Sequence, residues 1–217
     1  MLNLVEELFL LAIDDDRGVV HPSASTGLPY GMAGAILSEL TFSGKLGLEG
    51  NKVVILENLV CNDEILDESL AKIVQAEKPR KATYWINVLS QHNKQLRSRV
   101  AASLVAMGAL RKEGKRFLWV IPYEAYPQQD ASAKYWVKQR LREAVLTQFQ
   151  PEARTLGLLS LLHACGMLGL VFTKDERRRA RKRIEELVQG EIIGEAVAQT
   201  LEEISAAAAA AALAAAT

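Results

Sequence analysis

In this 217-residue chain, two clusters of cationic side chains have the residue types and the spacing to bind a ligand. Lysine and arginine neutralise phosphate groups, and the planar guanidinium of arginine does so through two parallel hydrogen bonds. The first cluster contains Lys94, Arg97 and Arg99, with Arg111, Lys112, Lys115 and Arg116 close behind.

An apolar segment follows this first cluster directly, and it reads Phe117-Leu118-Trp119-Val120-Ile121. An apolar hairpin beside cations fits a membrane surface, where cations meet anionic headgroups and aromatic rings lie just below them. The same arrangement fits a winged-helix nucleic-acid binder, in which a helix and a wing both contact the duplex. It equally fits a buried hairpin or a contact between copies of the chain. The residues alone leave these alternatives open.

A second run of cations begins at Arg177 and ends at Arg183. Helical spacing places Ala180, Ile184 and Leu187 on one apolar stripe and leaves the charges around the rest of the helix. Acidic residues on both sides of the run lie at distances that allow ion pairs along a helix. The pattern favours a solvated helix face, and an anion-binding patch is the alternative.

Catalytic residues are scarce in this chain, which has three histidines and two cysteines. His163 and Cys165 are two positions apart, so on a helix they point in different directions, and we interpret both as core residues. No zinc spacing, phosphate-binding loop, dinucleotide fingerprint or hydrolase motif occurs. The sequence therefore predicts a protein that is not an enzyme and needs no cofactor or metal. The distant cysteines, Cys61 and Cys165, fit a reducing compartment, so we predict a cytoplasmic protein.

The overall composition narrows the function classes further. The chain carries 26 Lys+Arg against 26 Asp+Glu, and 49% of its residues are hydrophobic. A disordered chain is excluded by this hydrophobicity, and general coating of nucleic acid is disfavoured by the zero net charge. Residues 155–173 lack Asp, Glu, Lys and Arg, and we interpret them as a buried core helix rather than a membrane span.

The elements that must position these side chains are mostly helical. Hydrophobic periodicity and end signals predict helices over residues 3–13, 31–42, 66–75, 82–90, 94–107, 131–148, 174–188 and 191–217, with another after Pro151. Thr173 and Glu176 form a capping-box signature. Hairpins are predicted over residues 45–56 and 110–121, with turns at Glu49-Gly50 and Glu113-Gly114. No linker separates two domains, so residues 1–217 form one compact, mainly α domain with short β-hairpins.

An internal echo relates the two hairpins. A shift of 64 residues superimposes Gly44 on Gly108 and Glu49-Gly50 on Glu113-Gly114. Either a duplication or the common needs of a helix-to-hairpin junction would produce this pattern.

Five segments carry a resemblance to a known family across nearly the whole chain. They are residues 4–15 (LVEELFLLAIDD), 31–40 (GMAGAILSEL) followed by 44–46 (GKL), 95–99 (QLRSR) leading to 108–110 (GAL), 117–119 (FLW) leading to 126–127 (YP), and 159–164 (LSLLHA) leading to Phe172. In this order the chain resembles the Golgi phosphoprotein 3 family. Its short start and alanine-rich tail resemble the bacterial branch.

The resemblance implies a helical domain with a protruding apolar hairpin that includes Phe117, Leu118 and Trp119. It implies a peripheral membrane protein that binds phosphatidylinositol 4-phosphate, or another anionic phospholipid, in a basic pocket on the cytoplasmic face of a membrane. It also implies self-association through the hairpin. The chain begins at its first predicted helix, so the coat-adaptor role of a basic N-terminal tail is not expected.

The family's phosphate-binding residues map only in part onto this sequence. The later basic pair falls on Lys94 and Arg97, and Arg99 is a candidate to assist them. The early arginine falls on Ala33, and an aromatic residue of the pocket falls near Ala24. Two cations without a stacking partner predict weaker or less selective recognition. Nucleic acid is the least favoured partner.

Overall fold

The computed structural model describes residues 2–91, 93–117, 121–147 and 150–215. Its helices are α1 (Leu4–Ala12), α2 (Leu28–Phe42), α3 (Glu64–Val74), α4 (Ala82–Ser90), α5 (Asn93–Ala106), α6 (Ser132–Leu146), α7 (Ala153–Ala164), α8 (Lys174–Val188) and α9 (Ile192–Ala215). Two 3-10 turns are η1 (Pro22–Ala24) and η2 (Leu168–Leu170). The strands are β1 (Leu46–Glu49), β2 (Lys52–Ile55), β3 (Arg80–Lys81), β4 (Glu113–Phe117) and β5 (Ile121–Ala125). The prediction of a mainly α fold with short hairpins is confirmed.

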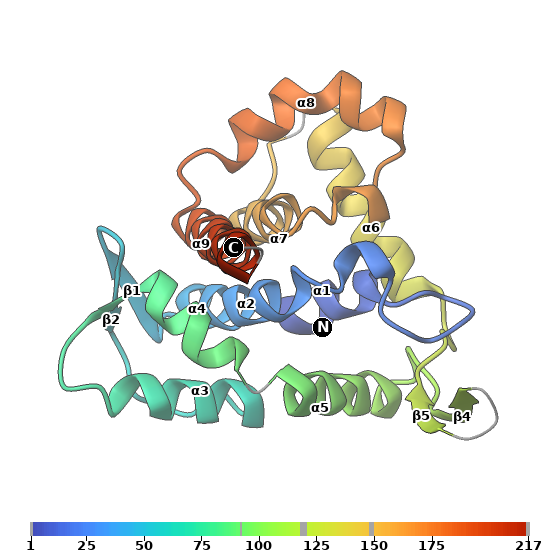
Figure 1. Ribbon diagram of the computed structural model, residues 1–217, viewed down its shortest axis with the longest axis horizontal. Coiled ribbons are helices and arrows are strands. Elements are labelled where there is room, and N and C mark those ends of the chain that lie inside the picture. Colours follow the sequence, from blue (N-terminus) through green and yellow to red (C-terminus); the bar gives the residue numbers. More distant parts are fainter. Residues whose placement is uncertain (1, 92, 118–120, 148–149, 216–217) are drawn as a thin grey trace.

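The helices α1 and α2 form the centre of the molecule (Figure 1). Every residue of α1 is buried, and α2 contacts α1, α4, α7 and α9. A capping box starts α1, because the Asn3 side chain accepts from the Glu6 N–H at 2.9 Å and the Glu6 carboxylate accepts from the Asn3 N–H at 2.9 Å. The helix α2 begins three residues before the predicted start, and Pro29 lies in its first turn, where a missing N–H costs nothing.

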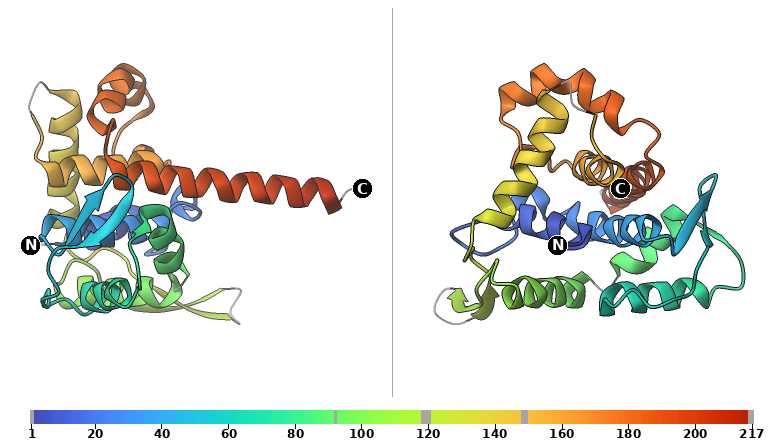
Figure 2. Two further views of the ribbon diagram at one scale, coloured as in Figure 1. Left: turned by 90° about the vertical axis from the view of Figure 1, so that its left-hand side faces the viewer. Right: turned by 180° about the vertical axis from the view of Figure 1, so that it is seen from behind.

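The charge-free stretch was predicted as one buried core helix, and this is correct only for its first part, because α7 ends at Ala164 and the rest forms a turn and η2, which has no buried residue. A β-carbon at Gly194 of α9 would lie 1.7 Å from the Oγ of Ser160 in α7, so the two helices cross with no room for a methyl group. The carboxyl end of α9 extends beyond the rest of the molecule (Figure 2). Within the described ranges, no helix is long and apolar enough to cross a membrane.

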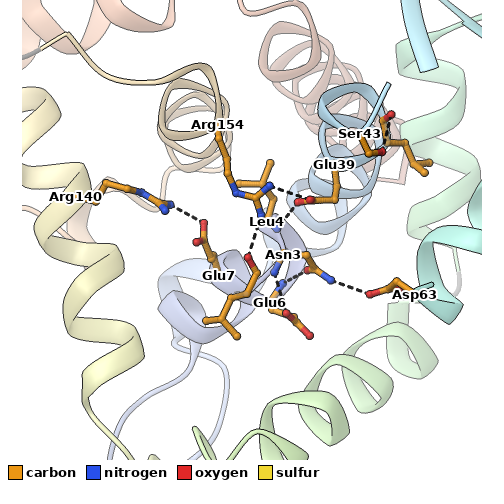
Figure 3. Close-up of polar contacts among 11 residues, drawn as sticks. Asn3, Leu4, Glu6, Glu7, Glu39, Ser43, Asp63, Arg140 and Arg154 are labelled. Carbon is orange, nitrogen blue, oxygen red and sulfur yellow. Dashed lines mark hydrogen bonds and ion pairs between the residues drawn. The ribbon is translucent and has the colours of Figure 1, made fainter. Parts of the chain in front are cut away.

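Buried carboxylates tie α1 to its neighbours (Figure 3). Glu39 of α2 accepts from the Leu4 N–H at 2.7 Å and from the Arg154 guanidinium of α7 at 2.8 Å. Glu7, which is 3% exposed, pairs with Arg140 of α6 at 2.7 Å. Glu7 and Glu39 each have an arginine partner, whereas the buried Glu6 carboxylate is satisfied by the Asn3 N–H and the Ser103 hydroxyl.

The first hairpin agrees with its prediction, and the second differs from it. In the sheet β1-β2-β3, the β1–β2 turn contains Gly50 with a φ of +58°. In the second hairpin, Gly114 lies inside β4 and pairs with Glu124 of β5. The predicted turn at Glu113-Gly114 is therefore wrong, and β4 and β5 are joined by residues 118–120, which lie outside the described residues.

The two helix-to-hairpin segments that a shift of 64 residues superimposes have similar structures only where their helices end. Gly44 after α2 has a φ of +72° and Gly108 after α5 has a φ of +76°. Glycine adopts this left-handed conformation without strain and is common where a helix ends. The shared feature of the two segments is thus a helix terminus, and the hairpin turns that follow fall at different positions.

Candidate anion-binding site

Lys94 and Arg97 line one hollow of about 360 Å³ at the first turns of α5. Residues three apart on a helix lie on the same face, which brings the two cations together. Ser98 of α5 also lines the hollow, which is completed by the end of α1, the loop that follows α1 and the end of β5, through Phe9, Ile13, Gly18, Val19, Val20, Glu124 and Tyr126. Two cations therefore stand against a largely apolar wall.

The loop after α1 forms that wall because its backbone is held in place. The Asp14 carboxylate accepts from the Arg17 N–H at 2.8 Å, and the Gly18 carbonyl accepts from the Tyr126 N–H at 2.7 Å. Gly18 has a φ of +69°, and a β-carbon there would lie 2.2 Å from the Pro127 nitrogen. Only glycine fits this position without moving the chain.

Lys134 of α6 contacts the same loop and holds it in place. Its side chain is buried, and its ammonium group donates to the Ile13 carbonyl at 2.6 Å and pairs with Asp15 at 2.5 Å. Burial lowers the pKa of Lys134, and the hydrogen bond with Asp15 opposes that shift. The sequence interpretation missed this residue. Its spacing with Val137 and Leu141, on the buried face of α6, was the available signal.

Arg97 is partly withdrawn from water. Arg97 is half-buried, burial lowers the pKa of its guanidinium, and its Nε is buried without a hydrogen-bond partner among the described residues. Within the described part of the chain, neither Lys94 nor Arg97 forms an ion pair. A partly desolvated cation without a counter-ion favours the binding of an anion.

One carboxylate, that of Glu124, also lines the hollow. Lys112 lies 2.5 Å from it, and the Tyr126 hydroxyl donates to it at 2.6 Å. These hydrogen bonds, with that from Lys112 the larger, lower the pKa of Glu124, so it stays ionised and is balanced by Lys112. The positive charge of the hollow therefore comes from Lys94 and Arg97.

Arg99 is not brought to this hollow. Its guanidinium pairs with Glu68 of α3 at 2.7 and 3.1 Å and with Glu64 at 3.1 Å. It lines a separate pocket of about 260 Å³ between α3, α4 and α5. The assisting role expected for Arg99 would require it to leave two carboxylates.

The other predicted site residues are those of the second hairpin and two alanines. Phe117 ends β4, and its backbone pairs with Ile121. Leu118 and Trp119 lie outside the described residues, so a hairpin tip in a membrane or oligomer contact stays a prediction. Ala33 and Ala24 are each 0% exposed, so neither lines the hollow.

Three cations of the second run form ion pairs within α8. Arg178 pairs with Asp175 at 3.1 Å, Arg181 with Glu185 at 2.8 Å, and Lys182 reaches Glu186 at 3.6 Å. The Thr173–Glu176 capping box is present at the start of the helix. For these three cations, the solvated-face interpretation is correct.

The histidine and cysteine interpretation is half right. Cys165 is buried and its Sγ donates to the Gly27 carbonyl at 3.3 Å, and burial raises the pKa of its thiol to about 12. His163 is exposed and is not the core residue we expected, because it falls on the outward side of the last turn of α7. Burial, followed by the hydrogen bond with Asp67, raises the pKa of Cys61 to about 11, so neither thiol is an activated nucleophile at neutral pH.

Comparisons with known proteins agree with the resemblance seen in the sequence. A sequence-family model described as Golgi phosphoprotein 3 (GPP34) matches residues 4–204. Vacuolar protein sorting-associated protein 74 of Schizosaccharomyces pombe is 27% identical over 225 aligned positions, which cover 86% of this chain and 66% of the relative. The protein of the same name from Eremothecium gossypii is 24% identical over 225 positions, which cover 86% and 67%. The chain thus spans about two thirds of the length of these relatives.

Proposed function

The chain belongs to the Golgi phosphoprotein 3 family, and from this premise we propose that it is a non-catalytic peripheral membrane protein that binds anionic phospholipid headgroups. Phosphatidylinositol 4-phosphate is the ligand that the family resemblance suggests. The observation that carries the proposal is the shared hollow of Lys94 and Arg97, whose charges have no ion-pair partner within the described residues. The site of action would be the cytoplasmic face of a membrane.

The chemistry of the hollow matches a phosphorylated headgroup. A phosphomonoester offers several oxygens, so the Arg97 guanidinium can donate two parallel hydrogen bonds while the Lys94 ammonium binds a third oxygen. The binding would also relieve the unsatisfied Nε of Arg97. The apolar wall of Ile13, Val19 and Val20 suits the carbon skeleton of a sugar alcohol ring.

The same geometry limits the expected affinity. Two cations bind the phosphate, and the buried Ala33 and Ala24 replace the third cation and the stacking partner that the resemblance suggests. Binding through few exposed charges is weak and sensitive to salt. Insertion of Phe117, Leu118 and Trp119 into the interface would add apolar contact area.

Vesicle co-sedimentation tests the proposal. Phosphatidylcholine vesicles with and without phosphatidylinositol 4-phosphate would be compared for the wild type and for Lys94→Ala/Arg97→Ala. We expect the double variant to bind the phosphoinositide vesicles at least about tenfold more weakly, because charged hydrogen bonds are lost. A variant with Arg178→Ala/Arg181→Ala removes two cations from α8 and should bind like the wild type. Equal binding by the wild type and the Lys94/Arg97 variant would reject the site.

The hairpin alternative is tested on the same samples. In Trp119→Asp, a lower molecular mass by light scattering together with unchanged vesicle binding would assign the hairpin to self-association. Reduced vesicle binding at unchanged mass would assign it to the membrane.

A further inference from the structure

Four exposed cations gather at the end of the molecule that carries the sheet β1-β2-β3. Three lie on strands, where Lys52 of β2 is directly opposite Lys81 of β3, and Arg80 of β3 is opposite Val53. The fourth, Lys78, lies in the loop that leads into β3. We call Lys52, Lys78, Arg80 and Lys81 the end surface. Figure 1 shows this sheet and the β4–β5 hairpin at opposite ends of the longest axis, so the end surface is separate from the hollow of α5.

The cations of the end surface lack ion pairs among the residues that the structure describes. Glu49 stands opposite Lys52 across the β1–β2 hairpin, and still no ion pair forms. Cations near the other hairpin behave differently, since Arg111 pairs with Glu113 at 2.7 Å and Lys115 pairs with the same carboxylate at 3.3 Å. The end surface therefore carries four cations without ion pairs among the described residues, with Glu49 and Glu77 as the neighbouring carboxylates.

The arrangement is electrostatically unfavourable for the isolated protein. Like charges directly opposite each other on neighbouring strands destabilise a sheet. Lys81 is also the N-cap residue of α4, a helix without a side-chain cap, and a cation at this end opposes the helix dipole. Protection of an edge strand against aggregation accounts for cations on β3, but β2, which carries Lys52, is the central strand. Lys52 is opposite Glu49 on its other side, so the sheet offers it one favourable and one unfavourable neighbour.

Aromatic and apolar groups surround these charges. Tyr84 of α4 is 45% exposed, and the Arg80 guanidinium lies 5.3 Å from its ring centroid. A pocket of about 100 Å³ beside them is lined by Lys78, Arg80, Pro79, Val54 and the largely buried Trp85, among others. The indole N–H of Trp85 is buried without an acceptor among the described residues.

We propose that the end surface is a second contact for the phosphate groups of an anionic bilayer, an inference that rests on the proposed function. A surface with four cations and an exposed tyrosine matches the headgroup layer, where lysine and arginine meet phosphates and tyrosine lies at the water boundary. Nucleic acid fits less well because the chain has no net positive charge. Each basic side chain near such a surface strengthens binding about fivefold.

A charge-removal variant tests this contact. Lys52→Gln/Lys78→Gln/Arg80→Gln/Lys81→Gln would be titrated with phosphatidylcholine vesicles that contain phosphatidylserine, which supplies anionic charge without phosphoinositide. We expect affinity to fall at least about tenfold and to depend less steeply on salt. The control, Lys174→Gln/Arg177→Gln/Arg178→Gln/Arg179→Gln, removes the same charge from α8 and should keep most of the binding. Unchanged affinity in the end-surface variant would overturn the proposal.

The outcomes separate this inference from the proposed function. If the end-surface variant keeps its affinity while Lys94→Ala/Arg97→Ala loses it, the end surface fails and the headgroup site stands. If the reverse holds, the headgroup site fails and the end surface stands. Removing like charges should leave the melting temperature unchanged or raise it, so a folding defect is detectable by circular dichroism. Stronger competition by polyglutamate or DNA than by added anionic vesicles would assign the surface to a different partner and overturn the membrane contact.

Discussion

The ammonium group of Lys134 lies 2.5 Å from the Asp15 carboxylate, although the two residues are 119 positions apart in the chain. This contact joins α6 to the loop that walls the hollow of Lys94 and Arg97. The same ammonium satisfies the carbonyl of Ile13. The shape of the candidate lipid site is therefore fixed from α6, an element that does not line it.

Replacing Lys134 should loosen the loop. In Lys134→Met, the Ile13 carbonyl loses its donor, and an unsatisfied buried acceptor costs about 1–3 kcal/mol of folding free energy. Urea unfolding measures the change. Lys138→Met, one helical turn away and only half-buried, should stay within about 0.5 kcal/mol of the wild type. Equal stability of the two variants would show that Lys134 does not hold the loop.

Arg97 and Arg99 should respond in opposite ways to the same substitution. Arg97→Met removes a half-buried cation without an ion pair in the described structure, so the free energy of unfolding should be unchanged or higher, while phosphoinositide binding weakens. Arg99→Met breaks the pairs with Glu68 and Glu64 and should lower stability by about 0.5–1 kcal/mol. Parallel urea and vesicle titrations would measure both. A larger stability loss in Arg97→Met than in Arg99→Met would contradict the assignment.

Glu176 should make stability depend on acid pH. Hydrogen bonds from Arg142, and then from the Thr173 backbone, lower the pKa of Glu176 from 4.5 to about 2. Because the pKa is lower in the folded state, this contribution is present above pH 4.5 and is lost as the pH falls toward about 2. The melting temperature of the wild type should therefore fall toward that of Glu176→Gln across this window. Arg142→Met removes the main cause and should flatten the profile too, whereas a wild-type profile in that variant would refute the explanation.

The start of α8 could be predicted from the sequence alone. Thr173 and Glu176 predict the start of α8 correctly, because the capping box is a local arrangement that needs no distant partner. The second hairpin was misjudged because Glu113-Gly114 resembles a turn locally. In the structure Gly114 pairs with Glu124, and this cross-strand pairing, not the local sequence, decides where the turn falls.

The candidate site was predictable only as far as helical spacing reaches. Lys94 and Arg97 share a face because they are three residues apart, whereas Arg97 and Arg99 are two apart, about 200° around the helix. Their proximity in the sequence therefore predicted that Lys94, Arg97 and Arg99 act together. In the structure, Arg99 lines a separate pocket. The walls from Val19, Val20 and Tyr126 come from loops, which carry no periodic signal, so only tertiary contacts reveal them.

The close crossing of α7 and α9 also constrains how this chain can evolve. A methyl group on Gly194 would collide with Ser160, and one on Gly34 of α2 would lie 2.7 Å from side-chain carbons of Leu161 and Val197. Substitutions at these glycines can persist only with simultaneous change in a second helix. Divergence should therefore be slow and correlated where α2, α7 and α9 meet.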